Sequence, residues 1–150
     1  MTIASLDHLE NHLKTLVIGA SGLVGRYLLK EFSAIGEALG TFNKQKQDDL
    51  VQLDLAQPDA ITRLSKDFRP DTILLPGALT NVDFCEENEA LSQKVNLDGT
   101  CWVANCAEQL GARLVYFSTD YVFDGTAGPY AESDALNPIN VYSRHKAAAE

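Results

Sequence analysis

The 150-residue sequence lacks long apolar runs, and no window approaches the ~18 residues that a membrane-spanning helix needs. It also lacks a basic cluster: its 12 Lys and Arg residues are scattered, and 21 Asp and Glu residues bring the net charge to −9. An acidic protein without a local basic patch repels phosphate backbones, which argues against nucleic acid as a partner. Hydrophobic residues still make up 45% of the chain, which excludes intrinsic disorder and suits one domain with a buried core.

Cysteine is scarce, and the N-terminus has no targeting pattern. The three cysteines form no C-x-x-C pair, and an odd number is a poor disulfide framework, which favours the reducing cytoplasm. We interpret Cys85, Cys101 and Cys106 as small core residues and Trp102 as packing within a helix. The first ten residues are acidic where a secretion signal would be basic and then apolar, so residues 1–13 are expected to be a short polar extension.

His8 and His12 are the one histidine pair with the spacing of a helical metal site. A metalloprotease helix would carry Glu directly after the first His, but Leu9 stands there. A solvated pair is the simpler interpretation, and we assign no metal site.

From Lys14 onward, short β-like runs alternate with helical stretches, a pattern typical of βαβ units around a parallel sheet. Strands are expected at residues 14–19, 38–42, 51–55, 72–75 and 113–117. Helices are expected at residues 23–35, 58–68 and 86–110, with another starting after Pro138 and a long loop at residues 118–137. The predicted fold class is therefore α/β: a Rossmann-like, doubly wound parallel sheet over residues 14–150.

A glycine-rich segment, G-A-S-G-L-V-G at residues 19–25, joins the first strand to the first helix. Gly19 permits a tight turn, Gly22 lets the backbone approach a pyrophosphate, and Gly25 lets the helix pack closely on the sheet. The free amide groups and the positive end of the helix then face an anion. Because the segment lies between a clear strand and a clear helix, it predicts nucleotide binding rather than a plain turn.

The segment after the second strand, T-F-N-K-Q-K at residues 41–46, carries no acidic residue. An acid here would hold the ribose hydroxyls of NAD and repel a 2′-phosphate. Lys44 or Lys46 would instead attract that phosphate, and Thr41 or Asn43 could donate a hydrogen bond to it. The pattern favours NADP(H), although NAD(H) stays open; the alternative is a solvated basic turn.

Asp54 and Leu55 end the expected third strand. They could cover an adenine ring, with Asp54 accepting a hydrogen bond from its amino group. They could equally be a strand end followed by a helix cap.

Tyr142 and Lys146 lie four residues apart, and so on one face of a helix. That helix follows the fifth strand, near the sheet edge where a nicotinamide would bind. An ammonium group beside the phenol would lower its pKa from about 10 and prepare Tyr142 to act as a general acid. Ser118 or Thr119, at the end of the same strand, could hydrogen-bond a reacting carbonyl oxygen; the alternative is a turn capped by these hydroxyls.

Three segments together resemble one family: residues 19–25, residues 118–125 (S-T-D-Y-V-F-D-G) and residues 138–146 (P-I-N-V-Y-S-R-H-K). They are similar to the extended short-chain dehydrogenase/reductases, in the dTDP-4-dehydrorhamnose reductase (RmlD-like) branch. The resemblance implies reduction of the 4-keto group of a nucleotide-linked 6-deoxy sugar by NADPH or NADH. It assigns the catalytic hydroxyl to Thr119, the general acid to Tyr142 and the supporting amine to Lys146.

The resemblance also assigns Ala78, Thr80 and Asn96 to the coenzyme. With the residues above, the expected coenzyme-binding set is Gly19, Ser21, Gly22, Leu23, Val24, Gly25, Asn43, Lys44, Asp54, Leu55, Ala78, Thr80, Asn96, Tyr142 and Lys146. Two segments depart from the family pattern. Pro76 and Gly77 replace a common Asn-Ala pair, while Ser143 and His145 replace a Gly and a Thr or Ser.

Members of this family continue well beyond the length of the present sequence. We therefore expect this chain to lack the last strands and the sugar-nucleotide domain, and to bind NADPH weakly without turnover. A non-catalytic regulatory subunit is the alternative function, since that of methionine adenosyltransferase resembles the same branch. The residues do not decide between a monomer and a homodimer.

Overall fold

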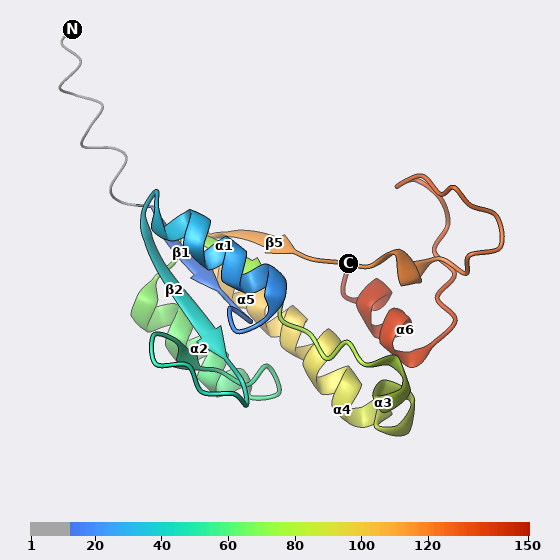
Figure 1. Cartoon of the computed structure of the whole chain (residues 1–150), viewed down its shortest axis with the longest axis horizontal. Helices are drawn as coiled ribbons and strands as arrows, with labels where there is room; N and C mark the ends of the chain where they lie inside the picture. Colours follow the sequence, from blue (N-terminus) through green and yellow to red (C-terminus); the bar gives the residue numbers. More distant parts are fainter. Residues whose placement is uncertain (1–12) are drawn as a thin grey trace, which may run out of the picture.

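Five parallel strands form the centre of the structure, a computed structural model that describes residues 13–150 (Figure 1). They are β1 (Lys14–Val17), β2 (Glu37–Phe42), β3 (Val51–Gln52), β4 (Thr72–Leu75) and β5 (Arg113–Tyr116). Their order in the sheet is β3-β2-β1-β4-β5. The strand order therefore reverses between β1 and β4, the position at which Rossmann-like sheets bind ligands. The predicted α/β class is confirmed. His8 and His12 lie outside the described residues.

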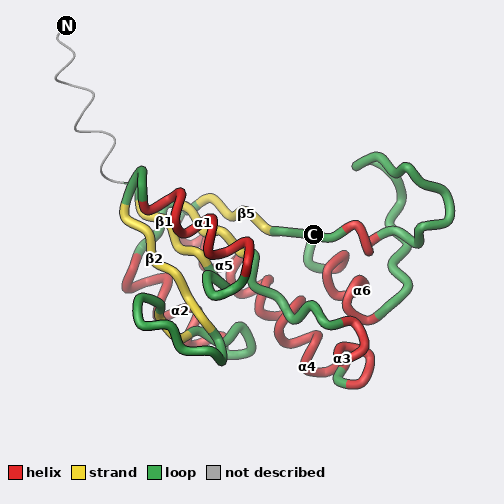
Figure 2. Tube along the Cα trace, viewed as in Figure 1, coloured by secondary structure: helices red, strands yellow, loops and turns green. Residues whose placement is uncertain are grey.

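Helices cover both faces of the sheet (Figure 2). Helix α1 (Leu23–Ser33) packs on one face, while α2 (Pro58–Phe68) and α5 (Gly99–Leu110) pack together on the other. Successive side chains of a strand point to opposite faces. Leu16 of β1 therefore joins the cluster under α2 and α5, and the next residue, Val17, joins the cluster under α1.

The long helix expected at residues 86–110 is instead a series of shorter segments. These are α3 (Val82–Glu87), α4 (Glu89–Ser92), a π-helical turn η2 (Gln93–Asp98) and then α5. The series starts earlier than expected because the Asn81 side chain accepts a hydrogen bond from the Phe84 amide at 2.8 Å and caps α3. It breaks at Asn88, whose φ of −131° is not helical.

Other predicted bounds differ by a few residues, apart from α2 and β4, whose bounds are confirmed. Strand β3 ends at Gln52 because Asp54 Oδ1 accepts a hydrogen bond from the Ala56 amide and turns the chain. The expected loop at 118–137 contains a short 3-10 turn, η3 (Asp120–Val122), and the last helix is α6 (Val141–Ala148). Within residues 13–150, no helix is long and apolar enough to cross a bilayer.

Burial corrects the prediction that Cys101 is a core residue and the interpretation of Trp102 as packing within a helix. Cys85 and Cys106 are buried as predicted, but Cys101 is exposed and Trp102 is 43% exposed. Helix α5 turns Val103 toward the sheet together with Cys106, three positions later. Residues 101 and 102 fall outside this apolar stripe, so neither contributes to the core.

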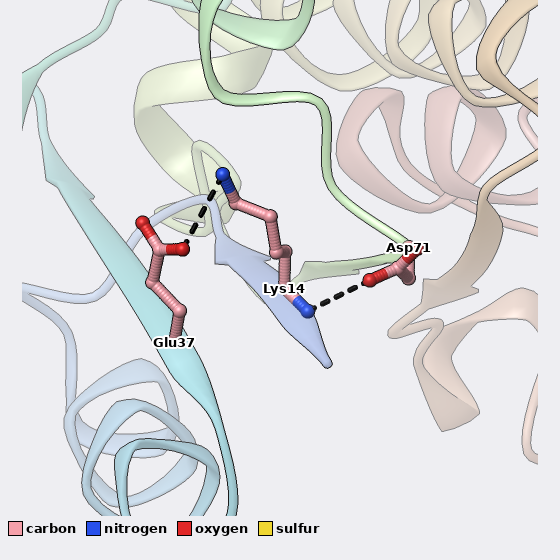
Figure 3. Close-up of polar contacts among 3 residues, drawn as sticks. All are labelled: Lys14, Glu37 and Asp71. Carbon is pink, nitrogen blue, oxygen red and sulfur yellow. Dashed lines mark hydrogen bonds and ion pairs between the residues drawn. The ribbon is translucent and has the colours of Figure 1, made fainter. Parts of the chain in front are cut away.

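Three residues tie the strands together at the amino end of the sheet (Figure 3). The backbone amide of Lys14 donates a hydrogen bond to Asp71 Oδ2 at 2.8 Å, and its ammonium group lies 3.3 Å from Glu37 Oε2. The same ammonium group lies 4.7 Å from the centre of the Phe68 ring. These contacts fix β1 between β2 and β4 at the end opposite the glycine-rich turn.

Candidate functional site

The glycine-rich turn has two glycines that the fold requires and one that it does not. Gly19 has a φ of +95°, and a Cβ on it would lie 2.5 Å from the Gly77 Cα atom. A Cβ on Gly25 would overlap the Gly19 carbonyl oxygen. A Cβ on Gly22 would meet only this same oxygen, at an acceptable 3.4 Å. The backbone at Gly22 is therefore open toward the space in front of helix α1.

This space is a groove of about 370 Å³ at the carboxyl ends of β1, β2 and β4. Much of the predicted coenzyme-binding set lines it: Gly19, Ser21, Gly22, Leu23, Val24, Gly25, Asn43, Leu55, Ala78 and Thr80. A second hollow of about 390 Å³ adds Lys44 and Asp54. The two share Asn43, Ala78 and Val95 and so form one continuous depression.

Other lining residues were not predicted from the sequence, and they include Ile18, Phe42, Leu53 and Val95. They are apolar residues of strand ends and of η2, whose composition resembles that of any core residue. Only the strand order, which brings them to one edge, identifies them as groove residues.

Thr41 has a partner within the protein and also lines the groove. Its hydroxyl oxygen accepts a hydrogen bond from the Gly19 amide at 3.1 Å, and the residue is 1% exposed. Thr41 thus supports the glycine-rich turn, and this contact does not use its hydroxyl hydrogen. Thr41, Asn43 and Lys44 line the groove or the adjoining hollow, whereas Lys46 lies near Asp48 in solvent.

Asn96 also acts from behind the groove and does not line it. It is 1% exposed, and its amide oxygen accepts a hydrogen bond from the Leu79 amide at 2.8 Å. Its amide nitrogen donates to the Leu79 carbonyl oxygen at 2.9 Å. Both backbone groups of Leu79 are thereby held, and the neighbouring residues Ala78 and Thr80 present their surfaces to the groove.

Helix α6 carries Tyr142 and Lys146, and its start is fixed twice. The Asn140 side chain accepts a hydrogen bond from the Ser143 amide at 2.8 Å, in a capping box. The Val141 amide donates to Glu86 Oε1 at 2.6 Å, which ties α6 to α3. Figure 1 shows α6 beside α3 and α4, at the end of the molecule away from α2.

Tyr142 lies just behind the groove, where it packs against Leu79 and Cys85 and contacts the Tyr121 ring edge-on. Burial raises the pKa of its phenol, and hydrogen bonding with the Thr119 hydroxyl opposes this effect. The predicted lowering of this pKa by Lys146 is wrong for the structure described here. Burial dominates, so the phenol keeps its proton at neutral pH.

Lys146 is engaged elsewhere. Its Nζ atom donates a hydrogen bond to the Phe117 carbonyl oxygen at 2.6 Å and lies 3.9 Å from the centre of the Tyr116 ring. Burial lowers the pKa of the ammonium group to about 8. Neither Lys146 nor Tyr142 lines the groove, so a contact with a bound coenzyme requires the Lys146 side chain to change position.

The two hydroxyls at the end of β5 have different partners. Ser118 donates a hydrogen bond to Glu150, whereas Thr119 lies beside Tyr142 and affects its pKa. Thr119 Oγ1 also accepts a hydrogen bond from the Tyr121 amide at 3.2 Å, as the capping alternative requires. Of the two candidates, Thr119 is therefore the hydroxyl next to Tyr142.

A third hollow, of about 480 Å³, adjoins the start of α6 and is lined by Tyr121, Phe123, Asp124, Tyr130, Ile139 and Asn140 among others. Asp124 organises this loop by accepting hydrogen bonds from the Tyr130 hydroxyl at 2.6 Å and the Asn137 amide at 2.7 Å. Such hydrogen bonds, that of Tyr130 above all, hold the pKa of the Asp124 carboxyl well below its usual range. This third hollow therefore includes the two residues that precede α6, the helix that carries Tyr142.

Comparison with known proteins gives one family and two kinds of relative. The model of the RmlD substrate binding domain family matches residues 13–150. Methionine adenosyltransferase 2 subunit beta of Bos taurus is 35% identical over 138 residues, which are 91% of this chain and 41% of that protein. A dTDP-4-dehydrorhamnose reductase of Burkholderia thailandensis is 33% identical over 139 residues, 92% of this chain and 44% of that protein.

Solved structures agree with the sequence comparison. A hypothetical dTDP-4-dehydrorhamnose reductase from Sulfolobus tokodaii superposes with a TM-score of 0.87 at 33% identity, over 91% of this chain and 50% of that one. A dTDP-4-dehydrorhamnose reductase from Bacillus anthracis, in complex with NADP, gives a TM-score of 0.79 at 30% identity, over 92% and 48%. The chain spans about half the length of the proteins it matches.

Proposed function

The chain belongs to the RmlD substrate binding domain family, and from this premise we propose that it carries the coenzyme-binding part of an NADP(H)-dependent reductase. The substrate class is a nucleotide-linked 4-keto-6-deoxy sugar, as for the dTDP-4-dehydrorhamnose reductases it resembles. Thr119, Tyr142 and Lys146 are the catalytic residues of this short-chain dehydrogenase/reductase chemistry. A groove with an open glycine backbone, next to a protonated phenol, supports the proposal.

Gly22 is the observation that carries it. The fold leaves room for a side chain at this position, yet the residue is glycine, at the N-cap of α1. The first turn of α1 contains no acidic residue, so its free amide groups favour an anion. A pyrophosphate that approaches the backbone here needs the space that a Cβ would fill.

The chain's own groups suit the proton transfer that the reaction requires. A bound nicotinamide coenzyme supplies the hydride. Tyr142, protonated at neutral pH, donates its proton to the carbonyl oxygen of the sugar. The Thr119 hydroxyl hydrogen-bonds the same oxygen and stabilises its developing negative charge. Lys146 exchanges its Phe117 contact for the ribose of the nicotinamide and brings its positive charge to the site.

Asn43 and Lys44 support NADP(H) over NAD(H). Both line the hollow next to the groove, and the segment at 41–46 offers no carboxylate to hold two ribose hydroxyls. The Bacillus anthracis relative was solved in complex with NADP.

The test is a fluorescence titration of the 150-residue protein with NADPH and with NADH. We expect NADPH to bind about tenfold more tightly, a difference of ~1.4 kcal/mol. Absence of binding by both coenzymes would overturn the proposed site.

We expect no steady oxidation of NADPH on addition of a dTDP-linked 4-keto-6-deoxy sugar, because the chain covers only 44% of the Burkholderia reductase. Steady turnover would contradict this second expectation.

A second candidate function is a non-catalytic, NADP-binding subunit. The 35% identity with methionine adenosyltransferase 2 subunit beta favours it. The engagement of the Lys146 amine with the Phe117 carbonyl oxygen, rather than with the groove, favours it too. Mixing the protein with a methionine adenosyltransferase catalytic subunit discriminates the two. A stable complex by gel filtration, without NADPH oxidation, supports the subunit; the lack of any complex excludes it.

A further inference from the structure

His145 lies three residues after Tyr142 in helix α6, and it is a buried titratable group that the proposed chemistry does not use. The residue is 8% exposed. Its Nδ1 atom lies 2.9 Å from Ser92 Oγ, which is fully buried at the end of α4. Which of the two groups donates this hydrogen bond depends on the other partners of Ser92.

The direction of each hydrogen bond follows from Asn96. Its amide nitrogen donates to the Leu79 carbonyl oxygen and, at 3.2 Å, to Ser92 Oγ. Ser92 therefore accepts from Asn96, and its own hydrogen can be donated to His145 Nδ1. The oxygen could also accept a second hydrogen bond from a protonated Nδ1, but burial disfavours the charged ring. Donation by Ser92 fits the neutral imidazole with its hydrogen on Nε2.

These contacts form a continuous buried chain from Leu79 through Asn96 and Ser92 to His145. Leu79 belongs to the loop whose neighbouring residues line the groove, and His145 belongs to the helix of the acid. The start of α6 is tied to α3 through Glu86. The pair of Ser92 and His145 ties α6 to α4 one turn later, on a different element from the Lys146 contacts with Tyr116 and Phe117.

We propose that His145 is a positioning residue, which holds Tyr142 in register with the coenzyme groove through its hydrogen bond from Ser92. This inference rests on the proposed function, because the register matters only if a coenzyme occupies the groove. The neutral imidazole is the competent form. A proton on Nδ1 would reverse the hydrogen bond, so that Nδ1 donates to the Ser92 oxygen and the Ser92 hydrogen loses its acceptor. It would also place a positive charge in a buried site, which costs free energy and weakens the tie.

The charges around His145 act in both directions. Burial lowers its pKa, and Arg144 on the same helix lowers it further, while Glu89 of α4 and Asp98 of η2 raise it. Glu86 of α3 is occupied with the start of α6. Burial dominates, so the imidazole is neutral at pH 7 and gains a proton only in acid.

The first test follows Leu79 by NMR in the coenzyme-free protein. We expect the Leu79 amide resonance to titrate in acid with the same midpoint as the His145 ring, because protonation at one end of the chain disturbs the other. The shift should vanish in Ser92→Ala and in His145→Asn, whose side-chain oxygen keeps an acceptor that does not titrate. If the Leu79 amide resonance does not shift with the midpoint of the His145 ring titration, the proposal is overturned.

The second test measures NADPH affinity between pH 5 and 8. We expect the wild type to lose about tenfold in affinity in acid, the value of one hydrogen bond, and His145→Asn to lose less. His145→Leu should bind about tenfold more weakly at every pH, with Ala148→Ser, at an exposed position of α6, unchanged. The same acid loss in wild type and His145→Asn would refute the role of His145. Failure of all proteins to bind NADPH would refute the proposed function and leave the NMR test to decide this inference.

Discussion

Gly22 and Gly25 lie three residues apart in one turn, but they are glycine for different reasons. Gly25 must be glycine for the chain to fold, since a Cβ would overlap the Gly19 carbonyl oxygen. Gly22 has room for a methyl group in the protein itself. We expect Gly22→Ala to unfold within a few degrees of the wild type and to bind NADPH at least about tenfold more weakly.

Gly25→Ala is the matched control for this prediction. It should lower the melting temperature or prevent folding, because the overlap is with backbone that cannot turn aside. Thermal unfolding and NADPH titration of the two variants give the required pair of measurements. If Gly22→Ala kept full affinity, the turn would have no phosphate to accommodate.

Lys146 makes the stability of the protein depend on pH. Burial lowers its pKa from an ordinary 10.5 to about 8, so between these values the unfolded chain binds more protons than the folded chain. The free energy of unfolding therefore rises with pH across this window. We expect the free energy of unfolding of the wild type to rise, relative to that of Lys146→Met, by up to about 3 kcal/mol as the pH increases from below 8 to above 10.5.

Urea unfolding of both proteins from pH 7 to 10 checks this expectation. The two proteins share every titratable group except Lys146. The difference between their free energies of unfolding therefore isolates the contribution of the Lys146 amine. Parallel curves would mean that the Lys146 amine keeps its ordinary pKa and is more hydrated than its contact with Phe117 indicates.

Single residues also show where prediction from the sequence stops. The glycine positions follow from local rules, because a strand, a turn and a helix in succession define their environment. Local rules leave Ser118 and Thr119 both open, and only the resemblance to the family selects Thr119. The contact of Thr41 with Gly19 joins residues 22 positions apart, so only tertiary structure reveals it. Asn96 was recognised by its motif, but its partners on Leu79 were not, since only tertiary structure brings the two together.

At the scale of elements, periodicity identified every strand and predicted α2 and β4 with their observed ends. It failed for residues 82–110, where apolar residues continue at helical spacing through several breaks. Asn81 and Asn88 are the residues that start and interrupt the series, and both are compatible with a helix surface when read alone. The π-helical turn at η2 has no sequence signal; it places Asn96 under Leu79.

The loop at 123–137 should depend on Asp124 alone among its acidic residues. Asp124 accepts hydrogen bonds from Thr126, Tyr130 and Asn137, and its carboxyl pKa is lowered, chiefly by Tyr130. A lowered pKa means that the charged, hydrogen-bonded form persists as pH falls and is lost only well into acid. We expect Asp124→Asn to accelerate amide hydrogen exchange in this loop at pH 7 while the sheet stays protected.

Asp134→Asn is the control, because Asp134 accepts one hydrogen bond, from the Ala131 amide. Hydrogen-exchange mass spectrometry of the loop peptides compares the two. Equal acceleration in both variants would show that the loop is held by its general packing and not by the Asp124 carboxylate.

At the scale of the whole molecule, the proposed coenzyme is an anion and the protein itself carries a net charge of −9. Long-range electrostatics oppose NADPH, so its preference over NADH must come from local contacts within the groove. Lys44 lines the hollow, whereas Lys46 lies 3.9 Å from Asp48 in solvent and outside the hollow. The two lysines change the net charge equally when each is replaced by glutamate, but only one faces the expected 2′-phosphate.

We therefore expect Lys44→Glu to weaken NADPH by about tenfold or more and NADH by much less, and Lys46→Glu to affect both slightly and alike. Thermal shifts at fixed coenzyme concentration measure this, since a ligand that binds the folded state raises the melting temperature more as the ratio of its concentration to its Kd increases. Higher salt should reduce the preference of the wild type for NADPH, because the Lys44 contact is partly exposed to screening. If both variants lost NADPH and NADH equally, the total charge of the molecule would decide coenzyme binding, and the local preference for a 2′-phosphate would be refuted.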